Sequence, residues 1–246
     1  NLGRFLGLAF ALPLLFFCAK GFVPKALAPR LVLLLVLGGG QGALGWYMVQ
    51  SGLVDVPEVS HYRLAAHLSM ALLLFSLVWW TALDLLTRAP RKPATLNHRI
   101  IVWSFLGVLA LQIVYGAFVA GLDAGYAYGT WPDMEGQFVP DEAFAGNTLW
   151  QRLTYGQGTV QFIHRMLAYG VAVFAVIIAL TFPQHLADKP ARLLARALVF
   201  VVLGQVVLGI LTLLQGVPVF LGTLHQGWAV ILLGVTLTLL HRLRQP

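Results

Sequence analysis

Residues 159–182 read TVQFIHRMLAYGVAVFAVIIALTF. Arg165 is the only side chain in this run that carries a permanent charge. At about 1.5 Å per residue, a helix of this length crosses a hydrocarbon core of roughly 30 Å. We therefore predict a membrane span here, with His164 a few residues inside it. An imidazole inside lipid is costly unless it is paired or ligates something, so this histidine is a candidate functional residue.

The composition places the whole chain in the same class. Hydrophobic residues make up 59% of the chain, charged residues make up 10%, and the mean hydropathy is +0.82. These values exclude an ordinary soluble domain and indicate several membrane spans. The predicted spans are residues 3–19, 31–53, 62–86, 97–122, 159–182, 192–216 and 219–241. The first span begins almost at Asn1, without an initiator Met, so we expect a further helix to precede it.

The basic residues set the predicted orientation. Of the 16 Lys and Arg, 12 fall in alternate loops, which the positive-inside rule assigns to the cytoplasmic or matrix side together with the C-terminus. These are Lys20, Lys25, Arg30, Arg88, Arg91, Lys92, Arg99, Lys189, Arg192, Arg196, Arg242 and Arg244. Seven of the nine acidic residues fall on the outer side: Asp55, Glu58, Asp123, Asp133, Glu135, Asp141 and Glu142. The basic balance is thus a topology signal, and we expect no nucleic acid partner. His67, His164 and His225 then lie near the outer membrane surface.

Parts of the chain repeat each other weakly. Gly40-Gln41, Leu44-Gly45 and Gly52 match Gly204-Gln205, Leu208-Gly209 and Gly216 at identical spacing, and Gln112-Ile-Val-Tyr-Gly116 carries the same Gln-x-x-x-Gly pattern. A duplicated four-helix unit explains this repeat. We predict an all-α polytopic membrane protein of two pseudo-symmetric four-helix bundles, with seven of the eight transmembrane helices present. The N-terminal half would be residues 1–92 and the C-terminal half residues 93–246. Transporters also contain such repeats, so a transporter stays an alternative at this step.

Three histidines at the same depth in the membrane suggest that they bind a metal ion or heme there. Four-helix bundles often hold cofactors between facing helices, and histidine is a usual axial ligand of heme iron. His164 and His225 come from two helices of one predicted half, so they are suited to ligate a heme from both sides, as in an electron carrier. Zinc is disfavoured, because no third or fourth ligand from Cys, Asp or Glu is found at this level. The alternative is that each histidine bonds a backbone carbonyl or lines a polar cavity.

Two arginines accompany these histidines. Arg63 lies one helical turn before His67, and Arg165 is adjacent to His164. Guanidinium groups suit heme propionates because Arg pairs with carboxylates bidentately; the alternative is that both side chains extend to the membrane interface. The longest predicted loop, residues 123–158, is rich in aromatic residues. It either covers an outer-facing site as a lid or rests among the lipid headgroups.

Six stretches carry a family resemblance: GALGWYMVQSGL at 42–53, YRLAAHL at 62–68, GAFVAGLDAG at 116–125, WPDM at 131–134, VQFIHRML at 160–167 and TLHQ at 223–226. In combination they resemble the heme A synthase family, in the branch found in mitochondria and related bacteria. The similarity runs along essentially the whole chain. No one of these motifs is diagnostic alone, but together they are specific.

The resemblance implies an enzyme, an oxidoreductase that converts a methyl group of heme O to a formyl group and so makes heme A for cytochrome oxidase. It implies that His164 and His225 ligate the iron of a heme b in the C-terminal half, with Arg165 near that cofactor. It implies that the N-terminal half binds the substrate heme O through two histidines, of which one maps onto His67, with Arg63 alongside. The other belongs to a Glu-x-x-His-Arg motif that would end just before Asn1, so the catalytic glutamate is expected upstream of Asn1.

An alternative function is a diheme b-type membrane electron-transfer protein without oxygenation chemistry. A divergent heme-binding remnant of the family is a further alternative. The expected partners are heme O and its synthase, membrane lipid and an unidentified electron donor, with homo-oligomerisation left open. The expected location is the bacterial inner (plasma) membrane or the mitochondrial inner membrane.

Overall fold

The computed structural model describes residues 2–50, 60–87 and 94–244. Several features of the sequence analysis lie outside the described residues: the end of the second span at 51–53, Gly52 of the repeat, the charged residues Asp55, Glu58, Arg88, Arg91 and Lys92, and the boundary between the two halves after residue 92.

Regular structure in the described residues is helical, apart from one isolated bridge between Met134 and Gln137. The helices are α1 Leu2–Ala19, α2 Ala28–Gln50, α3 His61–Leu86, α4 Leu96–Gly121, η1 Ala124–Tyr126, α5 Leu149–Thr154, α6 Gln157–Thr181, α7 Lys189–Leu214 and α8 Val219–Leu243. Within the described residues, α2, α3, α4, α6, α7 and α8 are long and apolar enough to cross a membrane, and α1 contributes a shorter apolar stretch, Gly7–Ala19. The prediction of an all-α polytopic membrane protein is confirmed.

The predicted spans match the helices to within three residues at every described end. At the starts of α4 and α7 the difference arises because a polar cap extends the helix beyond its apolar run. Helix α7 begins at Lys189, before the apolar residues, because the Asp188 side chain accepts a hydrogen bond from Ala191 N at 3.0 Å. Pro190 suits this first turn, where a backbone N–H would have no partner within the helix. Helix α4 begins in the same way after Thr95, whose hydroxyl accepts from His98 N.

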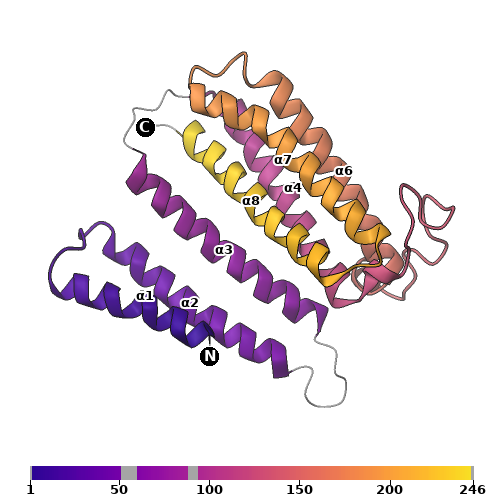
Figure 1. Cartoon of the computed structure of the whole chain (residues 1–246), viewed down its shortest axis with the longest axis horizontal. Coiled ribbons are helices and arrows are strands. Elements are labelled where there is room, and N and C mark those ends of the chain that lie inside the picture. Colours follow the sequence, from indigo (N-terminus) through magenta and orange to yellow (C-terminus); the bar gives the residue numbers. More distant parts are fainter. Residues whose placement is uncertain (1, 51–59, 88–93, 245–246) are drawn as a thin grey trace. The chain divides into compact units, whose positions relative to one another are not determined.

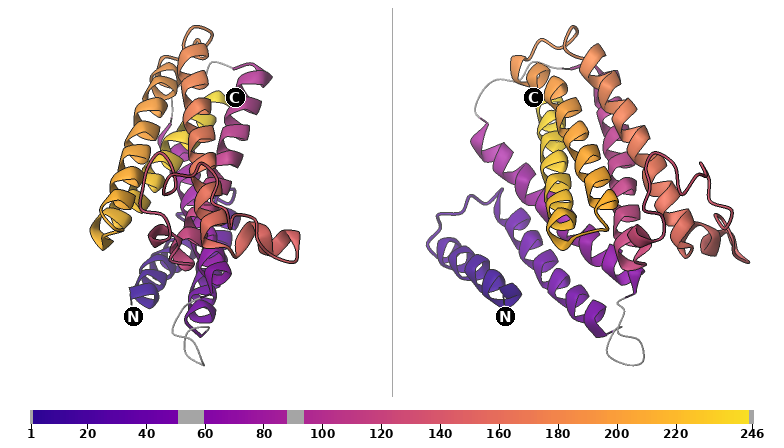
Figure 2. Two further views of the ribbon diagram at one scale, coloured as in Figure 1. Left: turned by 90° about the vertical axis from the view of Figure 1, so that its right-hand side faces the viewer. Right: turned by 45° about the vertical axis from the view of Figure 1, so that its right-hand side comes forward.

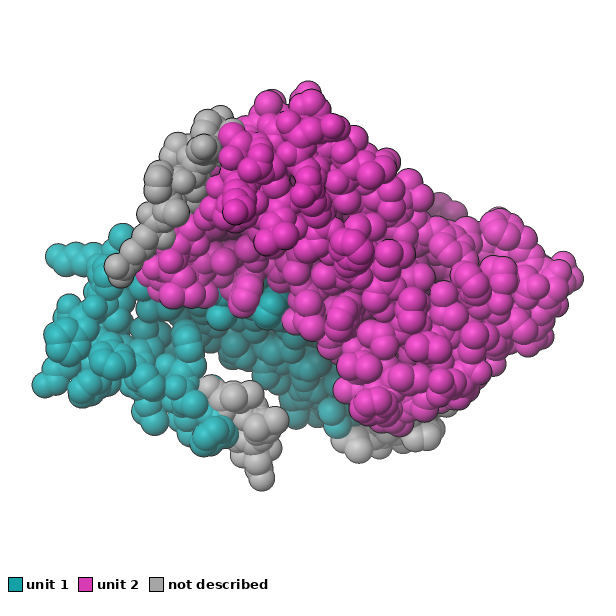
Figure 3. All heavy atoms as spheres, turned by 45° about the horizontal axis from the view of Figure 1, so that its top comes forward, with its two compact units in different colours: residues 1–78 teal, residues 79–246 magenta. Residues whose placement is uncertain are grey.

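The chain forms two compact units, residues 1–78 and residues 79–246, which Figure 3 shows in different colours. In unit 1, α1 packs against α2, and Leu14 and Leu34 are buried. The last turns of α3 belong to unit 2. There the Trp79 indole N–H donates to Gly234 O at 3.2 Å and Thr238 Oγ1 at 2.9 Å of α8.

Unit 2 is a bundle of four long helices. Helix α4 packs against α6 and α8, and α7 packs against the same two helices, so the ring order is α4, α6, α7, α8 (Figures 1 and 2). Helices α6 and α8 are therefore diagonal to each other, as are α4 and α7. Both α6 and α8 begin at the same end of this bundle. We call it the histidine end of unit 2, because His164 and His225 lie near the starts of these helices.

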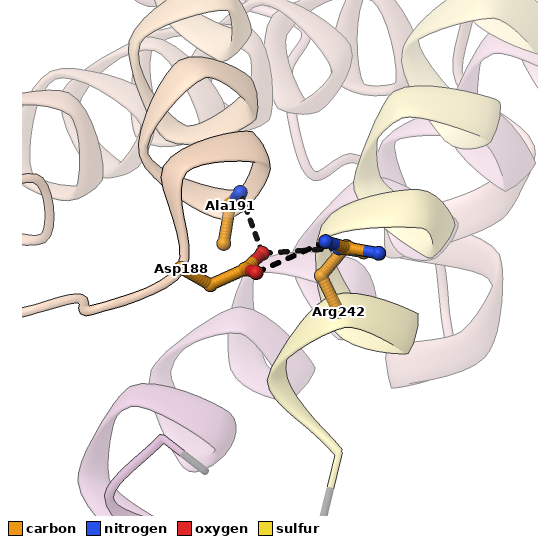
Figure 4. A network of polar contacts seen from close by, with 3 residues as sticks. All are labelled: Asp188, Ala191 and Arg242. Carbon is orange, nitrogen blue, oxygen red and sulfur yellow. Dashed lines mark hydrogen bonds and ion pairs between the residues drawn. The ribbon is translucent and has the colours of Figure 1, made fainter. Parts of the chain in front are cut away.

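The closely packed core of unit 2 lies toward the opposite end. In α7 the buried residues are Ala191, Ala195, Leu198 and Val202, and none follows Val202. In α8 they begin only at Leu232. Polar groups close this opposite end: the carboxylate of Asp188 accepts two hydrogen bonds from Arg242, each of 3.0 Å, beside its bond from Ala191 N (Figure 4). Asp84 pairs in turn with His241 and Arg244.

The connection between α4 and α6 lies at the histidine end and is ordered by side chains. It contains η1 and α5, and α5 was not predicted from hydropathy because it is only six residues long. A capping box starts α5, since Thr148 and Gln151 bond each other's backbone N–H groups. Phe162 of α6 contacts the rings of Phe138 and Phe144, so the loop packs against the first turns of α6.

Candidate functional site

His164 and His225 lie on the diagonal helices of unit 2 at the same level. His164 comes seven residues after Gln157, the first residue of α6, and His225 comes six residues after Val219, the first residue of α8. Both rings are thus roughly 9–11 Å inside the bundle along the helix axis. The structure therefore brings together the two residues that the sequence analysis paired.

A glutamine from a neighbouring helix contacts each of these rings. The side-chain Nε2 of Gln112, on α4, lies 3.4 Å from His164 Nε2. The side-chain Nε2 of Gln205, on α7, lies 3.3 Å from His225 Nε2. The two glutamines thus occupy one diagonal of the bundle, and the two histidines occupy the other.

A glycine one turn after each glutamine allows the ring to approach the helix. A Cβ atom placed on Gly116 would lie 3.1 Å from His164 Cε1, and one placed on Gly209 would lie 2.9 Å from His225 Cε1. Carbon atoms in ordinary contact are about 3.5–4.0 Å apart, so a larger residue at either position would require the imidazole to move, more so at Gly209 than at Gly116. We call the glutamine and glycine that contact one histidine its cradle.

Unit 1 contains a third cradle of the same kind. The Nε2 atom of Gln41, on α2, lies 3.4 Å from His67 Nε2 and donates to the His67 backbone carbonyl at 3.2 Å. A Cβ atom on Gly45 would lie 3.0 Å from His67 Cε1. Arg63, one turn earlier on α3, donates to Tyr47 O at 2.9 Å, and its guanidinium lies 3.8 Å from the centre of the Tyr47 ring.

Each cradle leaves polar atoms unsatisfied. The Nδ1 atoms of the three histidines and the Oε1 atoms of the three glutamines are buried and have no hydrogen-bond partner among the described residues. A buried polar atom without a partner costs about 1–3 kcal/mol. The same pair of atoms is left open at all three sites, which is expected if the sites receive a further group.

Helices α7 and α8 are less buried toward the histidine end. No residue of α8 before Leu232 is buried, and none of α7 after Val202. A cofactor ligated from two sides needs two opposed side chains, and His164 and His225 on diagonal helices fit a heme held by two histidines.

A metal ion held by side chains alone does not fit as well. Among the described residues, no group of three or more His, Cys, Asp and Glu side chains is placed to hold a metal ion. Two histidines are sufficient for heme, because the porphyrin supplies the other four iron ligands.

Arg165 is placed against the loop at the histidine end. Its side chain is buried, with 8% exposed, and its two terminal nitrogens donate to Asp133 O at 2.8 Å and Tyr128 O at 3.1 Å. Gln161, one turn earlier on α6, also donates to Tyr128 O, at 3.0 Å. The contacts of Arg165 described here are therefore with backbone carbonyls, and they anchor the loop to α6.

The fold and this site define a class: polytopic α-helical membrane proteins whose bundle presents a pair of histidines on diagonal helices. Residues 1–237 match the family described as cytochrome oxidase assembly protein. The heme A synthase of Rhodospirillum centenum is 44% identical over 99% of this chain and 66% of its own length. That of Caulobacter sp. strain K31 is 44% identical over 100% of this chain and 71% of its own length. That of Flavobacterium psychrophilum is 41% identical over 98% and 71%.

The chain belongs to the heme A synthase family of cytochrome oxidase assembly proteins. It spans about two thirds of the length of these curated relatives.

The histidines were predicted from the sequence, but the glutamine and glycine residues that contact them were not. The Gln-x-x-x-Gly pattern was visible at three positions and was interpreted only as a mark of duplication. Its spacing places both residues on one face of a helix, one turn apart, which was the available signal that both contact the same neighbour. The contact of Gln161 with the loop carried no such signal, because its partner is a backbone atom 33 residues away.

Proposed function

We propose that this chain acts as a heme A synthase, oxidising a methyl group of heme O to a formyl group to make heme A for cytochrome oxidase. The observation that carries the proposal is the diagonal pair His164 and His225, each with its own cradle, in a chain of this family. The assignment of the two halves, residues 1–92 for substrate and 93–246 for a resident heme, is part of the proposal.

We infer that His164 and His225 hold a heme b. A heme held there by both histidines would supply electron transfer. The protein places the two imidazoles at the same depth in the bundle, on the diagonal helices α6 and α8. The buried ring nitrogen and amide oxygen left without a described partner at each histidine support the presence of a further group at this site.

We infer that His67 ligates the substrate heme in the N-terminal half. Arg63 lies one turn nearer the start of α3, and its bond to Tyr47 O together with its contact with the Tyr47 ring hold the guanidinium in place. A positioned guanidinium there suits a carboxylate of the substrate. The cradle of His67 repeats those of the heme b pair, which supports the same chemical role for all three histidines.

The charge pattern supports a bacterial inner membrane or mitochondrial inner membrane location, with the C-terminus on the cytoplasmic or matrix side. A heme O-producing enzyme, as the source of substrate, and an electron donor are the partners that the reaction requires.

The three matching cradles also fit a diheme electron-transfer protein, and one experiment separates the two functions. The gene is expressed over its full open reading frame, together with a heme O synthase, in a host that makes no heme A. Pigments are extracted and separated by chromatography, and reduced-minus-oxidised spectra are recorded on the purified protein. We expect heme A from the wild type. We also expect loss of heme b from His225→Ala but not from His67→Ala.

A protein that binds heme b normally and leaves heme O unchanged would be an electron carrier. A protein with neither bound heme nor pigment conversion would contradict both functions.

A further inference from the structure

We propose that Trp228 makes the heme b site of unit 2 selective, because its ring occupies the space that the isoprenoid chain of heme O would need. Trp228 follows His225 on α8 by about one turn. Heme O carries this long chain where heme b has a vinyl group, so the two pigments differ in bulk at one edge of the porphyrin. The inference rests on the proposed function, since it takes the two halves to bind different hemes.

Two halves built from one repeat have to bind different hemes under the proposed function. His67 in unit 1 and His225 in unit 2 each contact a glutamine and a glycine of the preceding helix in the same way. The cradles are thus alike and do not discriminate between heme O and heme b. Discrimination has to come from side chains near these histidines that differ between the halves.

The indole ring of Trp228 is held against α7. Its Nε1–H group donates to Val201 O at 2.8 Å. The ring covers Gly204: a Cβ atom placed there would lie 2.9 Å from Trp228 Cζ2 and 3.1 Å from both Cε2 and Nε1. Because a hydrogen bond fixes its edge and a helix surface supports it, this ring forms a rigid wall.

This wall lies between His225 and the closely packed core. Leu232, the first buried residue of α8, comes one turn after Trp228. On α7, Gly204 beneath the indole directly precedes Gln205, which contacts His225. The indole therefore packs on the side of His225 that faces away from the histidine end.

A heme held by two histidines would place its apolar edge toward this wall. The porphyrin plane is perpendicular to the line between its axial ligands, and His164 and His225 lie at the same depth on diagonal helices. A heme ligated by both would run along the bundle, and a porphyrin is wider than one helical turn of about 5.4 Å. Charged propionates are costly in an apolar interior, so they belong at the histidine end. The opposite edge, with the vinyl groups of heme b or the isoprenoid chain of heme O, then faces Trp228.

The matched position in unit 1 holds a different side chain. Three residues after His67, where the repeat aligns with Trp228, the residue is Met70. Gly40 is the counterpart of Gly204, yet a Cβ atom placed on Gly40 would meet no described atom within 4 Å. Methionine is unbranched and adapts to irregular space. In the described part of unit 1, no side chain takes the place of the indole, as a half that accepts heme O requires.

The test measures which heme the site in unit 2 prefers. The full-length protein carries His67→Ala, so that the substrate site does not contribute. It is depleted of heme and titrated with ferric heme b (hemin) and with ferric heme O, and the two dissociation constants are compared. Relief of overpacking changes affinity about 5-fold to 150-fold. We therefore expect Trp228→Met to bind heme O more tightly than its parent by that factor, with the heme b affinity changed much less.

Three further variants complete the test. Trp103→Met is the matched control, since Trp103 is 54% exposed on α4, and it should leave both affinities unchanged. Trp228→Phe keeps a flat ring without the N–H group and should keep most of the preference for heme b. The reciprocal change, Met70→Trp, is made in a protein carrying His225→Ala and should weaken heme O binding in the N-terminal half.

An unchanged ratio of the two dissociation constants in a folded Trp228→Met protein would overturn the inference and leave the proposed function intact. If that variant does not fold, unchanged heme O binding in Met70→Trp has the same consequence. Equal changes in the affinities for heme b and heme O would also overturn it, because they would show a general loss of fit. Absence of heme b from the wild-type protein would overturn the proposed function, and the inference with it.

Discussion

Replacing Gly209 with alanine should weaken heme b binding by crowding its ligand. The added Cβ atom would lie 2.9 Å from His225 Cε1, about 0.6 Å or more inside an ordinary carbon contact. Overpacking of this kind costs about 1–3 kcal/mol. If the His225 ring moves away to relieve the overpacking, the binding free energy of heme decreases by the same amount. Because 1.4 kcal/mol corresponds to a factor of ten in affinity, the heme affinity should fall about 5-fold to 150-fold.

The assay measures heme b per protein in the purified full-length variant, followed by titration of the heme-depleted protein with hemin. Gly227→Ala on α8 is the control, because its Cβ would meet no described atom within 4 Å. Alanine is also a better helix former than glycine by about 1 kcal/mol. The control should therefore be at least as stable as the wild type and should bind heme normally.

A second comparison checks the assignment of the halves. Gly116→Ala, with its Cβ 3.1 Å from His164 Cε1, should also lose heme b affinity, whereas Gly45→Ala should not. The reasoning is refuted if Gly209→Ala binds heme b as tightly as Gly227→Ala, because the cradle would then have no influence on the ligand.

Two further predictions concern the ends of unit 2. Arg165→Met removes charged hydrogen bonds to Asp133 O and Tyr128 O, each worth about 1.5–3 kcal/mol; we expect faster proteolysis within residues 131–148, and an unchanged cleavage rate would argue against an anchoring role. Asp188→Asn keeps a capping side chain for α7 but leaves Arg242 without its carboxylate. Breaking a buried pair costs about 3–5 kcal/mol, so we expect a clearly lower melting temperature in detergent, and a melting temperature equal to that of the wild type would contradict this account.

The helices were predictable because one physical requirement dominates them. A membrane span must be long, apolar and internally hydrogen-bonded, and each of these properties can be counted in the sequence. The ends were less predictable because they depend on local caps. Helix α7 begins three residues before the predicted span because Asp188 caps it, and the pairing of Asp188 with Arg242 of α8 depends on how the helices pack.

The candidate site was predictable at the level of its histidines and not at the level of their contacts. A polar residue in an apolar helix is conspicuous, so His164 and His225 could be selected directly. Their diagonal placement required the ring order of the bundle, which follows from packing and not from hydropathy. Arg165 shows the limit most clearly: the sequence suggested a carboxylate partner, whereas the structure shows backbone carbonyls of the loop against it.

The three cradles are what duplication of one helix pair would produce. In each of them a Gln-x-x-x-Gly pattern on one helix contacts a histidine on another helix, once in unit 1 and twice in unit 2. The spacing is constant because residues four apart lie one turn apart on the same helix face, and small residues allow helices in a membrane to approach closely. Hydropathy cannot predict such a contact, because the glutamine and the glycine must face a histidine that is 20 to 52 residues away in the sequence.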